Sequence, residues 1–102
     1  MKRRIIFNPE AEEDLLHLYE YIAEDSTSER ALRYVDRIEK FCFTLSTFPQ
    51  RGQPLRGALS GIRIVGFERR ASIVFRIIPD EVVILRILYG GRHLASFFPT
   101  GE

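Results

Sequence analysis

The sequence predicts an α+β domain in which a pair of helices covers one face of a C-terminal antiparallel β-sheet. The first half of the 102-residue chain places apolar residues at helical spacing. The second half carries runs of β-branched and alternating residues, and a stretch rich in Pro and Gly separates the halves. Helices and strands that are segregated along a chain are typical of this class. A chain of this length is expected to form a single domain, residues 1–102.

A short strand and a long helix are predicted at the N-terminus. The run KRRIIF, residues 2–7, favours a strand. The helix should begin with Asn8 as its cap and Pro9 in its first turn, where acidic residues also meet the positive end of the helix dipole. We expect this helix over about 9–25. One stripe of its surface is apolar and predicts the core-facing side: Ala11, Leu15, Leu18 and Ile22.

A second helix is predicted from near residue 29 to about residue 47. The segment EDSTSER interrupts the first pattern, with Ser26 and Glu29 at capping-box spacing and Ser28 as another candidate cap. Apolar residues of this helix form two parallel rows, where one row is enough for a core. The first row is Ala31, Val35, Ile38, Cys42 and Leu45, and the second is Tyr34, Phe41 and Phe48. The second row therefore predicts that a further element or partner packs against this helix. Cys42 is expected to be a buried apolar residue.

The second half predicts a loop and three strands. Residues 48–61 concentrate Pro, Gly and polar side chains and should form the loop. The predicted strands are 62–67, 71–78 and 82–89, and the segments Glu68–Arg70 and Pro79–Glu81 should form the turns between them. The last two strands are expected to pair as an antiparallel hairpin.

Alternation of side chains sorts this hairpin into two faces. One face is apolar apart from a Tyr hydroxyl and should pack under the helices: Ile73, Phe75, Ile77, Val83, Leu85, Ile87 and Tyr89. The other face mixes aliphatic residues with arginines: Ser72, Val74, Arg76, Ile78, Val82, Ile84, Arg86 and Leu88. Arg76 and Arg86 share this face if Ile78 pairs near Val82. Such a face predicts an interaction surface, unless the C-terminal residues 94–102 fold over it and complete the core.

Charge and composition narrow the classes of function. The net charge of +1 argues against a general polyanion binder, but residues 51–102 carry eight arginines and four acidic residues. An arginine-rich half predicts recognition of an acidic partner. Because the chain has one cysteine, no apolar run near the ~20 residues of a membrane span and no signal-peptide pattern, we expect a cytoplasmic protein.

Metal and cofactor sites are not predicted. The two histidines, His17 and His93, stand far apart in the sequence without clustered ligands, and His17 receives no role. Gly90 and Gly91 are not followed by the helix that a phosphate-binding loop needs.

Several segments together resemble ParE-type toxins of the RelE/ParE superfamily. They are AEEDLLHLYEYIAED, ALRYVDRIEKFCFTLSTFPQRGQP, GIR, IVFRI and VVILRILYGGRHL, and they span nearly the whole chain. The resemblance implies a RelE/ParE-like fold and a type II toxin that inhibits DNA gyrase. It also implies a ParD-like antitoxin whose extended C-terminal segment wraps around the toxin. No sequence-specific DNA binding by this chain alone and no membrane association are expected.

The resemblance and the predicted faces together nominate the site residues. Predicted target-binding residues are Arg63, Arg76, Arg86, Arg92 and His93. Predicted antitoxin-binding residues are Tyr34, Phe41, Phe48, Val74, Arg76, Ile84 and Arg86. In the ParE tails that this chain resembles, a His precedes the glycine and an Asp follows the Arg, whereas here Tyr89 and His93 stand in those places.

Two other functions stay open. The RelE branch shares the fold and cleaves mRNA on the ribosome, which requires proton-transfer groups and cations around a phosphate. His93 and Tyr89 could transfer protons there, and Arg63 and Arg86 could hold the phosphate. A non-toxic module that only binds antitoxin, or controls an operator together with it, is the third hypothesis.

Overall fold

The computed structural model describes residues 2–90, and their elements follow the predicted order. Strand β1 (Arg4–Phe7) leads into helices α1 (Pro9–Asp25) and α2 (Ser28–Thr44). A short strand β2 (Gln53–Pro54) and a 3-10 turn η1 (Gly57–Leu59) lie in the segment that was predicted as loop. Strands β3 (Ile62–Phe67), β4 (Ala71–Ile77) and β5 (Glu81–Tyr89) complete the fold. The predicted α+β class is confirmed.

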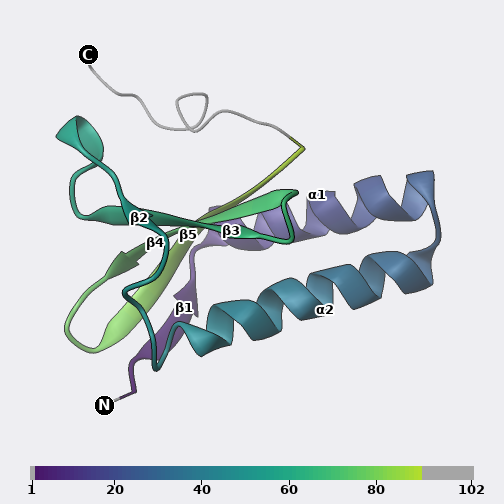
Figure 1. The fold of residues 1–102 in the computed structure, drawn as a ribbon. Helices are drawn as coiled ribbons and strands as arrows, with labels where there is room; N and C mark the ends of the chain where they lie inside the picture. Colours follow the sequence, from purple (N-terminus) through teal and green to yellow (C-terminus); the bar gives the residue numbers. More distant parts are fainter. Residues whose placement is uncertain (1, 91–102) are drawn as a thin grey trace.

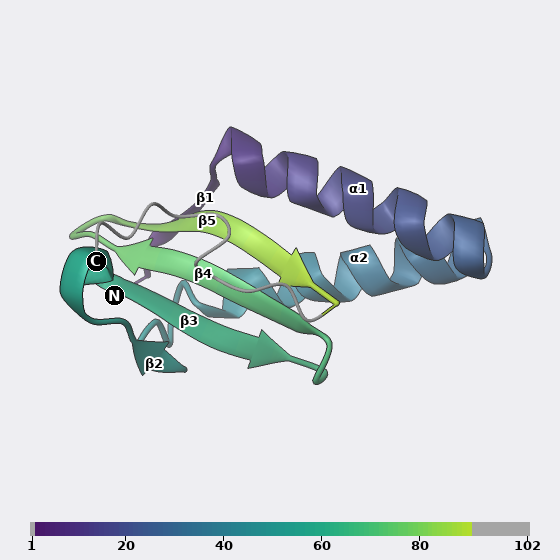
Figure 2. The same cartoon turned by 90° about the horizontal axis from the view of Figure 1, so that it is seen from above.

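The strands form one five-stranded sheet in the order β1-β5-β4-β3-β2. Neighbours from β2 to β5 run antiparallel, whereas β1 pairs with β5 in parallel, with Arg4 opposite Glu81 and Phe7 opposite Ile84. The N-terminal strand thus makes the sheet mixed. Both helices lie on one side of the sheet (Figure 2), and the turn between them extends past the end of the strands (Figure 1).

The helix boundaries follow local capping chemistry. Asn8 precedes α1 in an extended conformation, and Pro9 occupies the first turn, where its missing N–H breaks no hydrogen bond. The cap of α2 is Thr27, whose hydroxyl accepts a hydrogen bond from the backbone N–H of Arg30 at 3.1 Å. The predicted caps Ser26 and Ser28 are therefore wrong. Neither helix of the described residues is long and apolar enough to cross a membrane.

The main core lies between the helices and one face of the sheet. Its buried members come from α1, α2, β4 and β5, and they include Ala11, Leu15, Ile38, Cys42, Ile73, Phe75, Val82, Ile84 and Ile87. Burial raises the pKa of the Cys42 thiol to about 12, so this cysteine behaves as the small apolar residue that the sequence predicts.

A bulge in β5 changes which residues face this core. Val74 pairs with Arg86 and Phe75 pairs with Ile84, so Leu85 is left as an extra residue opposite the 74–75 step. One extra residue reverses the alternation on the two sides of the bulge. Val82 and Ile84 consequently face the helices and are fully buried, and the prediction that Val83 and Leu85 do so is wrong.

The second face of the sheet carries a small core of its own. Ile62, Val74 and Leu88 are buried there, and they pack with Leu55, Leu59, Ile64 and Leu85. Leu55 and Leu59 belong to the predicted loop, which therefore covers part of the face that the sequence predicts to be open. The other predicted cover, residues 94–102, lies outside the described residues.

Gly52 fits its position because it has no side chain. Its φ is +70°, and a Cβ there would collide with the carbonyl oxygen of Ile64 and lie 2.8 Å from the carbonyl carbon of Ile64 and from the Cα of Val65. Gly57 has a similar φ of +65° but open space around its Cα.

We expect Gly52→Ala to destabilise the protein by several kcal/mol, because it adds a collision with backbone atoms to the ~1–2 kcal/mol of the left-handed conformation. Gly57→Ala should show the conformational cost alone. Urea denaturation of both variants measures the difference, and equal losses would contradict the close approach of Gly52 to β3.

Candidate functional site

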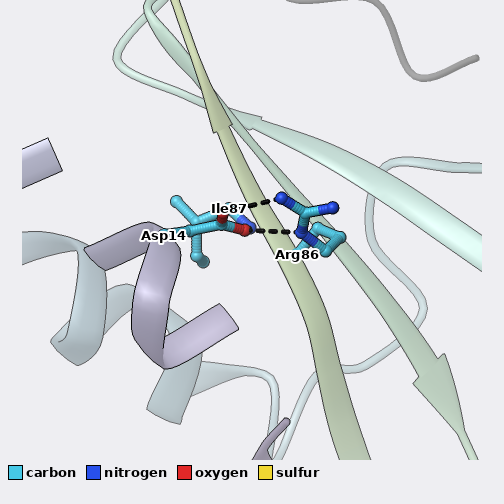
Figure 3. Close-up of polar contacts among 3 residues, drawn as sticks. All are labelled: Asp14, Arg86 and Ile87. Carbon is cyan, nitrogen blue, oxygen red and sulfur yellow. Dashed lines mark hydrogen bonds and ion pairs between the residues drawn. The ribbon is translucent and has the colours of Figure 1, made fainter. Parts of the chain in front are cut away.

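Asp14 forms the most buried polar contact among the described residues. Its carboxylate accepts hydrogen bonds from Nε and Nη2 of Arg86, both at 2.8 Å, and from the backbone N–H of Ile87 at 2.8 Å (Figure 3). The side chain of Asp14 is 6% exposed and that of Arg86 is 18% exposed. The hydrogen bond to Asp14 raises the pKa of Arg86 above its usual value, so this guanidinium stays charged.

The position of this contact follows from the unequal lengths of two strands. Strand β1 pairs only with residues 81–84 of β5 and then turns into α1, with the N–H of Asn8 donating to the carbonyl of Ile84. Beyond that point β5 has no strand at this edge, and the N–H of Ile87 would lack a partner. Asp14, one turn into α1, supplies the acceptor, and Arg86 supplies the charge that a buried carboxylate needs.

The predicted cations of the target-binding surface do not come together. Arg63 pairs with Phe75, so it lies on the helix side of β3, where it donates to the carbonyls of Arg51 and Gly52 at 3.1 and 3.4 Å. Arg76 pairs with Ile62 on the opposite side and is exposed. Arg86 pairs with Val74, two residues from Arg76, so the prediction that the two arginines share a face of the hairpin is confirmed, but the Arg86 guanidinium binds Asp14 of α1.

The predicted antitoxin-binding residues divide into buried and accessible ones. Three are buried at 9%, 0% and 0% exposure: Tyr34, Val74 and Ile84. Their side chains are part of the two cores; Val74 and Ile84 offer no surface, and Tyr34 shows only a small part of its ring. Phe41 is half-buried beneath the guanidinium of Arg51, Phe48 is 67% exposed, and Arg76 is exposed. Arg92 and His93, predicted to bind the target, lie outside the described residues.

Aromatic rings gather where β5 ends. Tyr89 meets Tyr21 of α1 and Tyr34 of α2 edge to face, each with ring centroids 5.8 Å apart. Phe67 of β3 also contacts Tyr34, with the same distance between ring centroids. Tyr89 therefore lies on the helix side, as its predicted face requires, and it joins both helices to the sheet.

The hydroxyl of Tyr34 is buried and meets no hydrogen-bond partner among the described residues. Burial is the main cause that raises the pKa of Tyr34 to about 12, and the nearby Tyr89 and Glu68 add to it. The group therefore remains a protonated donor at neutral pH.

A groove of about 790 Å³ opens beside these rings. Its walls come from the end of α1, the start of α2, the β3–β4 turn and the end of β5. Five arginines and a single carboxylate, that of Asp25, line it among the described residues. The arginines are Arg30, Arg33, Arg37, Arg69 and Arg70, and the aromatic lining is Tyr21, Tyr34 and Tyr89.

Two of these arginines hold the groove in shape. Arg37 donates two hydrogen bonds of 2.9 Å to the Glu68 carboxylate, and this bond is the first cause that lowers the pKa of Glu68. The pair ties the β3–β4 turn to α2. A hydrogen bond with the Tyr89 hydroxyl is the main cause that raises the pKa of Arg70.

The sequence carried a signal for this groove that the site prediction missed. Arg30, Arg33 and Arg37 follow one another at spacings of three and four, which places them along one side of a helix. Arg69 and Arg70 were assigned only to a turn. What could not be found from the sequence is that this turn lies against that side of α2.

Possible metal ligands do not cluster within the described part of the chain. No group of three or more His, Cys, Asp or Glu side chains lies close enough to hold an ion among residues 2–90.

Comparison with known proteins relates this fold to toxins. The family model of the ParE toxin of the type II toxin-antitoxin system parDE matches residues 5–94. Toxin ParE3 of Caulobacter vibrioides is 29% identical over 93 residues, covering 91% of this chain and 92% of that protein.

Two solved structures are similar to it at 26% identity. The chromosomal ParDE system from P. aeruginosa superposes with a TM-score of 0.76 over 86% of this chain and 96% of that chain. The RelBE2 toxin-antitoxin complex from Mycobacterium tuberculosis superposes with a TM-score of 0.70 over 88% of this chain and 100% of that chain.

We expect Arg86→Ala and Asp14→Ala each to lower the free energy of unfolding by about 3–5 kcal/mol, because either change leaves a buried charge without its partner. Arg76→Ala, which removes an exposed arginine from the neighbouring strand, should change it by less than ~0.5 kcal/mol. Chemical denaturation of the two single variants and the double variant gives the coupling between Asp14 and Arg86. Additive effects of the two single changes would contradict their direct interaction.

Proposed function

The chain belongs to the ParE toxin family of type II toxin-antitoxin systems, and from this premise we propose that it inhibits DNA gyrase and is neutralised by a ParD-like antitoxin. It is a toxin component, and its similarity to toxin-antitoxin systems and complexes supports an antitoxin as its partner. The gyrase target and the ParD-like character of the antitoxin are the parts that we propose.

The observation that carries the gyrase proposal is the divergence of the residues that a ribonuclease would need. Arg63 lies on β3 and its guanidinium binds loop carbonyls on the β2 side of the sheet. Arg86 lies on β5, two strands away, and its guanidinium binds Asp14 of α1. The two guanidinium groups are thus held by different partners, one at the β2 side of the sheet and one at α1, and this arrangement does not favour a joint grip on one phosphate with Tyr89. Inhibition of gyrase by binding does not require these side chains to meet at one phosphate.

The accessible end of the aromatic row on α2 supports an antitoxin-binding surface. Phe48 is 67% exposed just after α2 and lines a shallow pocket with Thr44, Pro49 and Arg51. A large exposed aromatic residue beside a pocket is the kind of anchor on which an ordered peptide segment folds. We propose that Phe48 anchors the antitoxin segment, together with Arg51 of the same pocket and Phe41, over whose ring the Arg51 guanidinium lies.

The gyrase proposal predicts that the purified chain blocks supercoiling by gyrase and accumulates its cleaved-DNA complex, while leaving mRNA intact in a translation reaction. Arg92→Ala and Arg76→Ala should each relieve growth arrest without loss of stability, because both are proposed to contact the target. Arg86→Ala is unsuitable here, since it also removes a buried ion pair.

The ribonuclease hypothesis and the non-toxic module hypothesis each predict a different result. Cleavage of mRNA that disappears in His93→Ala would establish the ribonuclease. Healthy growth on expression without antitoxin would establish a module without toxicity.

For the antitoxin surface, we expect Phe48→Ser to weaken antitoxin binding at least tenfold, because the change removes an anchoring aromatic ring. Leu32→Ser is the matched control, since Leu32 is 60% exposed elsewhere on α2. Isothermal titration with the antitoxin measures both affinities. An equal affinity for Phe48→Ser and the unchanged toxin would exclude this anchor.

A further inference from the structure

We propose that the arginine-lined groove between the helix turn and the β3–β4 turn binds single-stranded nucleic acid without sequence preference. The backbone phosphates lie on the guanidinium groups, and an unpaired base stacks on Tyr21. This site is separate from Phe48 and from Arg76, and the proposal does not depend on gyrase being the target.

The first argument is the local excess of positive charge. The whole chain carries a net charge of only +1, yet five of its fifteen basic residues line this one groove against the single carboxylate of Asp25. Arg33 of α2 and Arg69 of the turn make no hydrogen bond or ion pair with any residue of the described chain. Glu68 neutralises Arg37, but the remaining arginines outnumber Asp25 at the groove, and a bound anion relieves the repulsion among them.

The second argument is the fixed turn that presents part of this charge. Glu68 and Arg69 have φ values of 50° and 65°, the conformation of a tight two-residue hairpin turn, which the N–H of Arg70 closes by donating to the carbonyl of Phe67 at 3.2 Å. The two hydrogen bonds between Arg37 and Glu68 hold this turn against α2. The turn therefore places Arg69 at the groove.

The third argument is the chemistry of the tyrosines. Tyr21 is 60% exposed, and its ring is steadied by the edge-to-face contact with Tyr89, so a flat aromatic surface is available in the groove. The buried hydroxyl of Tyr34 is a donor that lacks an acceptor among the described residues, and it lies near Arg37 and Arg70. That hydroxyl has no accessible surface and does not reach a ligand, but the Tyr34 ring supports the Arg37 guanidinium, which lies 5.2 Å from the ring centroid.

Phosphodiester strands fit these features better than acidic peptides do. Bidentate arginines bind phosphates and carboxylates alike, so charge alone does not separate the two ligands. An exposed aromatic ring beside a cationic track adds stacking, which every base provides and which carboxylate side chains lack. The groove volume of about 790 Å³ lies in the range that holds a small organic ligand, and a nucleotide is of that size.

The test is fluorescence anisotropy of a labelled twelve-residue oligothymidylate titrated with the full-length toxin at several salt concentrations. The double variant Arg33→Gln with Arg69→Gln should raise Kd at least tenfold. It should also reduce the slope of log K against log salt by about 1.4, the value for two lost phosphate contacts on a single strand. Tyr21→Ala should raise Kd about tenfold, while Tyr21→Phe keeps the affinity because the stacking ring remains.

Arg76→Gln is the matched control, because it removes another exposed arginine, from the far face of the sheet. A control that loses as much affinity and salt slope as the double variant would overturn the proposal, since the binding would then reflect overall charge. Tighter binding of a labelled oligoglutamate than of the oligothymidylate would overturn it in favour of an acidic peptide. Equal binding of duplex and single strand, with Tyr21→Ala unchanged, would exclude stacking in the groove. Thermal unfolding of each variant confirms that these exposed substitutions leave the fold intact.

Discussion

The buried carboxylate of Asp14 is the interaction on which the rest of the structure depends. It accepts both arms of the Arg86 guanidinium and the N–H of Ile87, so one side chain joins α1 to the outer half of β5. Strand β1 is too short to pair with that half of β5, and the bulge at Leu85 makes the ladder irregular there. A charged acceptor supplied by a helix takes the place of the missing strand.

The arginines of the second half, which look alike in the sequence, have different tasks in the fold. Arg86 neutralises a buried acid, and Arg63 holds the carbonyls of the loop at Arg51 and Gly52. Such bonds satisfy groups that folding would otherwise leave unpaired, and they remove those cations from the set that can meet another molecule. Arg76 remains exposed. The contacts that each arginine makes in the fold, and not the count of arginines in the sequence, therefore decide which of them can bind another molecule.

Two surfaces stand out once the structural arginines are set aside. One is the apolar surface around Phe48 at the end of α2, which suits the antitoxin that a ParE-family toxin requires. The other is the cationic groove at the opposite end of α2, built from that helix and the β3–β4 turn. Because α2 contributes to both, this helix offers contacts of different chemistry at its two ends while its core-facing side packs on the sheet. A toxin of 102 residues can in this way carry separate contacts on one helix.

The sequence by itself determined the α+β class, both helices and the three long strands, because apolar periodicity and turn residues are local signals. It also determined the family, since the resembling segments span the chain. Only the tertiary structure decided the faces of β5, where the extra residue Leu85 reverses an alternation that no local pattern reveals. It decided as well that Arg86 meets Asp14, 72 residues away in the chain, and that the Arg69 turn lies against α2. Such pairings depend on how elements pack together, and packing is settled by the shape of the whole core.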